Sequence, residues 1–187
     1  NPMLMIARGV ASPRIPETFS FWLLSLRLGT AEGEVIEEQA FRAGLVDPAL
    51  SKALDRRVFS EFFQNSAQAV ASKGLSIALP LSAVGLLNTE LIDELLEHLQ
   101  RSPLPPRLLH LTIPASVFKT NPTQAISALH RLRQYGCRIV LSQVGRDLEL
   151  FDNLKYRIVD YLLLDSELSA SAPGNLIDEM WVSIIQG

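Results

Sequence analysis

The chain has 187 residues, of which 48% are hydrophobic and 20% are charged, and its formal net charge is −3. These values are typical of one globular domain, and they exclude a disordered chain and a nucleic-acid polymer as ligand, which needs a basic stripe. A single cysteine, Cys137, excludes an intrachain disulfide and a cysteine zinc site, so we expect a reducing, cytoplasmic setting. No apolar run approaches the roughly 20 residues of a membrane span, so we expect no direct membrane insertion.

Predicted strands and helices alternate along the chain. Residues 3–10 and 19–28 are rich in strand formers and predict a strand pair around a proline-containing connector. Residues 47–74 predict one long helix, with Asp47 as N-cap and Gly74 at its end. The remaining apolar and amphipathic patterns predict a helical stretch at 37–45, helices at 88–102, 121–136 and 175–186, and strands at 75–81, 106–114, 137–141 and 160–165.

This alternation of short apolar strands with helices predicts a parallel α/β sheet or barrel. About six strands are recognisable in a single domain over residues 1–187. A closed eight-stranded barrel typically needs about 250 residues, so we expect a truncated or open barrel. Since the chain starts without an initiator Met, we expect a fragment of a larger multidomain protein.

Several short motifs follow one another along the chain. They are LLSLRL at 23–28, GLV at 44–46, LDRRV at 54–58, SIALP at 76–80, LHLTIPAS at 109–116, the stretch from Leu132 through Gly136 to SQVG at 142–145, and DYLLLD at 160–165. Their order and spacing resemble the EAL domain, the family of cyclic di-GMP phosphodiesterases, over nearly the whole chain. The resemblance implies an EAL-type modified TIM-like barrel whose first strand is antiparallel.

The charged positions of the family are neutral in this chain. In the family, carboxylates and an asparagine at the strand ends collect metal ions, and a lysine helps activate the attacking water. Two-metal hydrolysis needs several anionic oxygens around Mg²⁺ or Mn²⁺, and the side chains present supply none. We therefore predict a degenerate EAL domain with no catalytic residue, no metal site and no Mg or Mn cofactor. The matching positions are Leu23, Ala78, Thr112, Ala115, Ser142, Gln143 and Leu163.

Three residues that match the family remain as candidate cyclic di-GMP contacts, namely Leu26, Arg27 and Asp55. The resemblance places Arg27 near a phosphate of the dinucleotide, and a guanidinium suits a phosphate because its planar fork donates two bonds. The alternative for Arg27 is an ion pair with a local acid. For Asp55 we favour a structural role, a hydrogen bond on its own helix.

Other polar residues are weaker candidates. His110 lies in a predicted strand without a second ligand at suitable spacing, and His98 and His130 lie in predicted helices, so we assign no metal to any of them. Asp165 ends a predicted strand in the right place for chemistry. Because Leu163 replaces the lysine that would accompany it, we expect a turn or capping role for Asp165.

Two functions of different class follow. The first is a catalytically inactive EAL-like signalling domain of a bacterial cyclic di-GMP pathway protein. It would act through contact with a protein partner or as a homodimer, with cyclic di-GMP as an optional ligand. The parent protein is either free in the cytoplasm or tethered to a membrane. A fold alone does not argue for catalysis. The alternative is a divergent active phosphodiesterase, which would need a new cluster of titratable groups, and only Asp147, Asp152 and Asp165 are scattered candidates.

Overall fold

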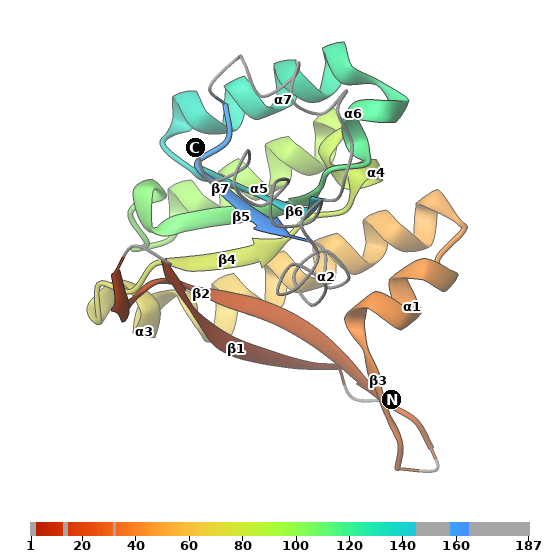
Figure 1. The fold of residues 1–187 in the computed structure, drawn as a ribbon, viewed down its shortest axis with the longest axis horizontal. Helices are drawn as coiled ribbons and strands as arrows, with labels where there is room; N and C mark the ends of the chain where they lie inside the picture. The colour runs from red at the N-terminus through yellow and green to blue at the C-terminus, as the bar shows by residue number, and fades with distance from the viewer. Residues whose placement is uncertain (1–2, 13–14, 32, 145–157, 165–187) are drawn as a thin grey trace, which may run out of the picture.

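The computed structural model describes residues 3–12, 15–31, 33–144 and 158–164. Its strands form one seven-stranded sheet in the order β1-β2-β4-β5-β6-β7, with β3 paired to β2 (Figure 1). β1 and β2 are antiparallel, as are β2 and β3, and the other neighbours are parallel. The strands are β1 (Met3–Ser12), β2 (Ile15–Gly29), β3 (Val35–Glu37), β4 (Ile77–Pro80), β5 (Leu109–Pro114), β6 (Arg138–Val144) and β7 (Tyr161–Leu164).

The expected mixed α/β fold with an antiparallel first strand is confirmed, and the described strands form an open sheet. All six predicted strands are present, and the prediction missed the three-residue β3. The predicted helix at 175–186 and the candidate residues Asp147, Asp152 and Asp165 lie outside the described residues.

Helices pack on one face of the sheet (Figure 1). The long helix predicted at 47–74 is divided at Ser66 into α2 and α3. Asn65 and Ser66 are poor helix formers because their side chains compete for backbone hydrogen bonds. The helices are α1 (Glu38–Gly44), α2 (Pro48–Asn65), α3 (Ala67–Ser72), α4 (Ala83–Leu86), α5 (Thr89–Arg101), α6 (Val117–Thr120) and α7 (Pro122–Tyr135), with a 3-10 turn at Pro106–Leu108.

The predicted helix boundaries rest on local signals that the structure confirms. Asp47 accepts a hydrogen bond from the Ala49 amide at 2.8 Å and caps α2. Asn88 caps α5 in the same way, through the Leu91 amide. Gly136 ends α7 with a φ of 106°, a left-handed conformation that favours glycine.

The main core lies between the sheet and its helices. Alternate side chains of a strand point to opposite faces, so Leu111 on β5 and Ile139 and Leu141 on β6 point toward this core. The intervening residues point to the other face. The described helices include none that is long and apolar enough to cross a membrane.

Candidate functional site at the strand ends

A second apolar cluster lies on the sheet face opposite the main core. Leu23 and Ala78 belong to it, whereas their neighbours Leu24 and Leu79 belong to the main core. Leu23 of β2 pairs directly with Ala78 of β4, and their exposed fractions are 9% and 0%. The cluster also holds Phe21 and Val140, with Val10, Tyr161 and Leu163 packed against it.

This cluster contains three of the positions that the EAL resemblance matches with metal-binding or catalytic groups. Leu23, Ala78 and Leu163 come from β2, β4 and β7, and all three pack into the same apolar cluster. Their hydrocarbon side chains have no oxygen that could bind a divalent cation. No group of three or more His, Cys, Asp or Glu side chains among the residues that the structure describes could hold a metal ion.

Polar atoms at the ends of β5 and β6 interact with the adjacent backbone. The Ser142 hydroxyl donates to the Ile113 carbonyl at 3.3 Å, and the Ser142 carbonyl accepts from the Ala115 amide at 2.9 Å. The two Ser142 bonds connect the ends of β5 and β6, whereas the Thr112 hydroxyl is buried without a hydrogen-bond partner.

Gln143 has a left-handed backbone conformation, with a φ of 56°. The register between β6 and β7 shifts between Leu141 and Val144, so Gln143 lies in a bulge. A left-handed conformation costs a residue other than glycine roughly 1–2 kcal/mol, and bulges often re-aim side chains beside active sites. The strand end thus keeps a strained turn that presents an exposed, neutral amide.

An aromatic group surrounds His110 on the same face of the sheet. The His110 ring is 5.5 Å from the Tyr161 ring in a stacked arrangement and 5.2 Å from the Phe21 ring. Its side chain is buried, and its Nδ1 atom has no hydrogen-bond partner. The pKa of His110 is lowered to about 4, mainly by burial and also by the nearby Arg138, while Asp160 partly opposes the shift. The imidazole is therefore neutral at pH 7.

Sequence reasoning considered His110 only as a metal ligand and missed this packing. The sequence carries one signal for the orientation of His110. As a polar residue between the apolar Leu109 and Leu111, it is predicted to point its side chain away from the main core. The contacts with Phe21 and Tyr161 join strands far apart in sequence, so no local pattern could reveal them.

Arg27 forms an ion pair with a local acid, which is one of the two expected alternatives. Its Nε lies 2.8 Å from Glu37 Oε1, and the two residues face each other across β2 and β3. The Arg27 side chain is 41% exposed. A contact between Arg27 and a phosphate stays a prediction.

Leu26 is completely buried in the main core, so its side chain points toward the helices. Its amide donates to Glu38 Oε2 at 2.9 Å. A ligand contact at Leu26 stays a prediction, but its side chain has no open path to the opposite face of the sheet.

Asp55 lies at the centre of a buried polar network. Its carboxylate accepts from Arg42 Nη1 at 3.2 Å and from the Ser82 hydroxyl at 2.6 Å. Arg42 also donates to Glu38 Oε1 at 2.6 Å. The expectation of a bond within the helix of Asp55 is wrong, because these partners belong to α1 and to the N-cap of α4. The network connects α2, α1, β2 and α4.

The surroundings of Asp55 are tightly packed. A Cβ atom at Gly85 would lie 2.2 Å from Asp55 Oδ2, so only glycine fits there without a shift. Burial raises the pKa of Asp55, and Arg42 and Ser82 partly oppose this effect. The enclosed carboxylate is thus a structural link between these elements, and a contact of Asp55 with cyclic di-GMP stays a prediction.

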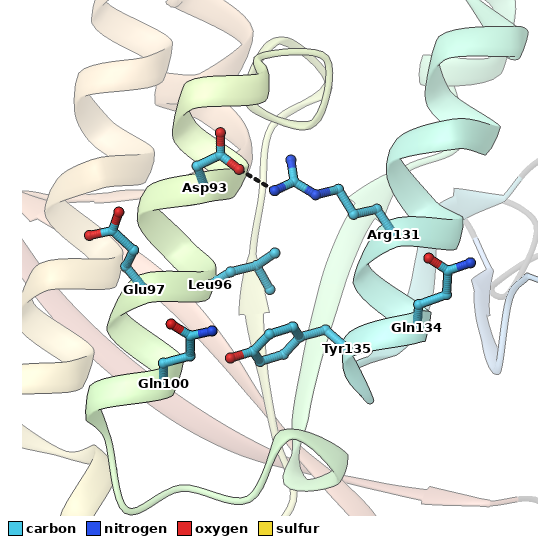
Figure 2. A pocket seen from close by; sticks show the side chains of 7 residues that line it. All are labelled: Asp93, Leu96, Glu97, Gln100, Arg131, Gln134 and Tyr135. Carbon is cyan, nitrogen blue, oxygen red and sulfur yellow. Dashed lines mark hydrogen bonds and ion pairs between the residues drawn. The ribbon is translucent and has the colours of Figure 1, made fainter.

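A polar groove of about 500 Å³ lies between α5 and α7 (Figure 2). An ion pair between Asp93 and Arg131 crosses it. Glu94, on the same helix as Asp93, pairs with Arg56 of α2 at 2.7 Å. Asp93 and Glu94 therefore link α5 to its neighbouring helices. The groove is lined by Asp93, Leu96, Glu97, Gln100, Arg131, Gln134 and Tyr135.

Comparison with known proteins identifies the family of this chain. The EAL domain model matches residues 23–185. Probable diguanylate cyclase DgcE of Escherichia coli (strain K12) is 59% identical over 187 residues, which are 100% of this chain and 17% of the relative. The chain thus spans about a sixth of the length of this curated relative.

Solved EAL structures have the same fold. The FimX EAL domain has a TM-score of 0.82 and 21% identity, over 98% of this chain and 73% of its own. The PaMucR phosphodiesterase in complex with c-di-GMP has a TM-score of 0.81 and 20% identity, over 98% and 74%. The FimX EAL domain from Pseudomonas aeruginosa bound to c-di-GMP has a TM-score of 0.81 and 22% identity, also over 98% and 74%. At these identities the likeness is one of fold.

The Asp55 network predicts a large stability effect. Asp55→Ala should lower the free energy of unfolding by roughly 3 kcal/mol, because it removes the buried acceptor of Arg42 Nη1 and of the Ser82 hydroxyl. Urea denaturation measures this change. Glu61→Ala is the matched control on α2, because it breaks only the exposed pair with Arg57 and should cost less than about 1 kcal/mol. Equal costs for the two variants would contradict a structural role for Asp55.

The low pKa of His110 predicts a pH-dependent stability. His110 takes up a proton near its ordinary pKa of 6.5 when unfolded but only near 4 when folded. Its contribution is therefore complete above pH 6.5 and is lost as the pH falls to 4, by at most about 3 kcal/mol. Urea unfolding across this range should show a shallower pH slope for His110→Phe. The matched control is His130→Phe on α7, and equal slopes for the two variants would contradict this assignment.

Proposed function

The chain belongs to the EAL domain family, and from this premise we propose that it is a catalytically silent EAL domain of a cytoplasmic cyclic di-GMP signalling protein, acting through protein–protein contact. One observation carries the proposal: Leu23, Ala78 and Leu163 pack into one apolar cluster at family metal-binding or catalytic positions. Leucine and alanine have no oxygen to offer Mg²⁺ or Mn²⁺, and Thr112, Ser142 and Gln143 are neutral. Metal-assisted hydrolysis of a phosphodiester therefore has no support in this chain.

The named relative is compatible with this proposal. A protein of E. coli named as a probable diguanylate cyclase matches this chain along its whole length. A cyclase makes cyclic di-GMP, and an active phosphodiesterase in the same protein would consume the product. A silent EAL domain avoids this conflict and leaves the fold available for contact with a protein partner or a second copy.

Binding of cyclic di-GMP without hydrolysis is the second candidate, and Arg27 favours it. Its half-exposed guanidinium is held by Glu37, whose side chain is 58% exposed. An exposed pair of this kind typically contributes only about 0–1 kcal/mol, so a phosphate could replace the carboxylate at small cost. The PaMucR phosphodiesterase and the FimX EAL domain from Pseudomonas aeruginosa, which share this fold, are solved with c-di-GMP.

Hydrolysis and binding assays with cyclic di-GMP test the proposal. We expect no turnover with Mg²⁺ or Mn²⁺. If the dinucleotide binds, calorimetry should give the same affinity with and without Mg²⁺, and Arg27→Ala should weaken binding about tenfold or more through loss of charge-assisted hydrogen bonds. Arg57→Ala, on the exposed side of α2, is the matched control. Absence of binding leaves the protein-contact role, whereas turnover in Mn²⁺ would contradict the proposal.

A further inference from the structure

Arg27 and Glu37 stand directly opposite each other on β2 and β3. Opposite residues of an antiparallel pair point to the same face of the sheet, and the Arg27 Nε lies 2.8 Å from Glu37 Oε1. Because side chains alternate along a strand, this is the face to which Leu23 points, away from the main core that holds Leu26. The Glu37 carboxylate thus occupies the guanidinium that cyclic di-GMP binding would assign to a phosphate.

A tight turn between β2 and β3 fixes the position of Glu37. The Thr30 amide donates to the Glu34 carbonyl at 2.8 Å, and the Glu34 amide donates to the Thr30 hydroxyl at 3.1 Å. Gly33 in this turn has a φ of 85°, a left-handed conformation that favours glycine. β3 therefore returns along β2 in a defined register, which places the Glu37 carboxylate beside Arg27 before any ligand arrives.

The next residue, Glu38, is held more firmly than Glu37. Its carboxylate accepts from the Leu26 amide at 2.9 Å and from Arg42 Nε at 2.6 Å. The Glu38 side chain is 18% exposed, against 58% for Glu37, so water and salt screen its contacts less. The junction of β3 and α1 therefore stays attached to β2 when Glu37 leaves Arg27. Release of Glu37 is a side-chain movement that needs no rearrangement of the fold.

We propose that Glu37 is a built-in competitor that sets the affinity of Arg27 for the phosphate of cyclic di-GMP. A carboxylate and a phosphate make the same kind of charge-assisted hydrogen bonds with a guanidinium, so the two anions exclude each other at Arg27. The ligand then binds Arg27 only in molecules whose Glu37 carboxylate has moved away. The inference rests on cyclic di-GMP binding, the second candidate under the proposed function, and adds the contact that regulates it.

The strength of the Arg27–Glu37 pair determines the size of the effect. An exposed ion pair favours its closed state by a factor of about one to five, so roughly one half to one sixth of the molecules have a free guanidinium. The apparent dissociation constant is the intrinsic constant divided by this fraction. Removal of the Glu37 carboxylate should therefore tighten binding about two- to sixfold. A purely structural role for Glu37 predicts equal or weaker binding instead.

Calorimetric titration of the chain with cyclic di-GMP, in the absence of metal, tests the inference. Glu37→Gln should tighten binding about two- to sixfold. Glu34→Gln is the matched control, because it removes the same charge from the same hairpin, and the Glu34 side chain has no ion pair with any residue that the structure describes. It should change the affinity less than about twofold, since solvent and salt screen a charge that does not contact Arg27.

A double variant separates the contact from the general loss of negative charge. In an Arg27→Ala background, Glu37→Gln should no longer tighten binding, because the guanidinium for which the two anions compete is gone. Equal tightening in both backgrounds would overturn the inference. Circular dichroism checks that each variant folds, which we expect because an exposed pair contributes little to stability.

The remaining outcomes separate this inference from the proposed function. Tighter binding by Glu37→Gln than by Glu34→Gln supports the inference, also where the native chain binds too weakly to measure. Affinity of Glu37→Gln equal to or below that of the native chain overturns it, as does a complete lack of binding by all variants, and the protein-contact role then stands. Turnover of cyclic di-GMP in Mn²⁺ would instead contradict the proposed function and leave the order of the affinities unaffected.

Discussion

Hydrocarbon packing at the ends of the strands is the interaction on which the rest of this account depends. A divalent cation in a phosphodiesterase site requires several anionic oxygens, and a carboxylate cannot be placed in an apolar cluster without a large desolvation cost. Leu23 and Ala78 meet across β2 and β4, and Leu163 packs against the same cluster from β7. Apolar side chains on both faces of the sheet then stabilise the fold, since this cluster adds to the burial provided by the helices on the other face.

The buried polar groups Asp55 and His110 stabilise the fold. Asp55 joins α1 to the N-cap of α4 through Arg42 and Ser82. The neutral His110 fills space between Phe21 and Tyr161, and a proton on it would be opposed by burial and by Arg138.

Local chemistry explains which parts of the fold could be predicted from the sequence. Asp47 and Asn88 cap helices, and Gly136 ends one, because each acts on backbone groups a few residues away. The elements that escaped prediction, β3, α4 and α6, have three or four residues and show too little periodicity. The candidate site is formed by contacts between residues that are distant in sequence. For example, the partners of Asp55 are 13 and 27 positions away. The neutral residues at the strand ends were identified by motif, but their mutual packing became visible only when the strands were assembled.

The most direct measurement is anomalous diffraction from crystals of this chain soaked in manganese chloride. If hydrocarbon fills the strand ends, the anomalous map should show no Mn²⁺ peak within coordination distance, about 2–2.5 Å, of any side-chain atom at Leu23, Ala78, Thr112 or Ser142. A pair of ordered Mn²⁺ ions about 3.5–4 Å apart at these strand ends, the spacing typical of two-metal hydrolysis, would contradict the account.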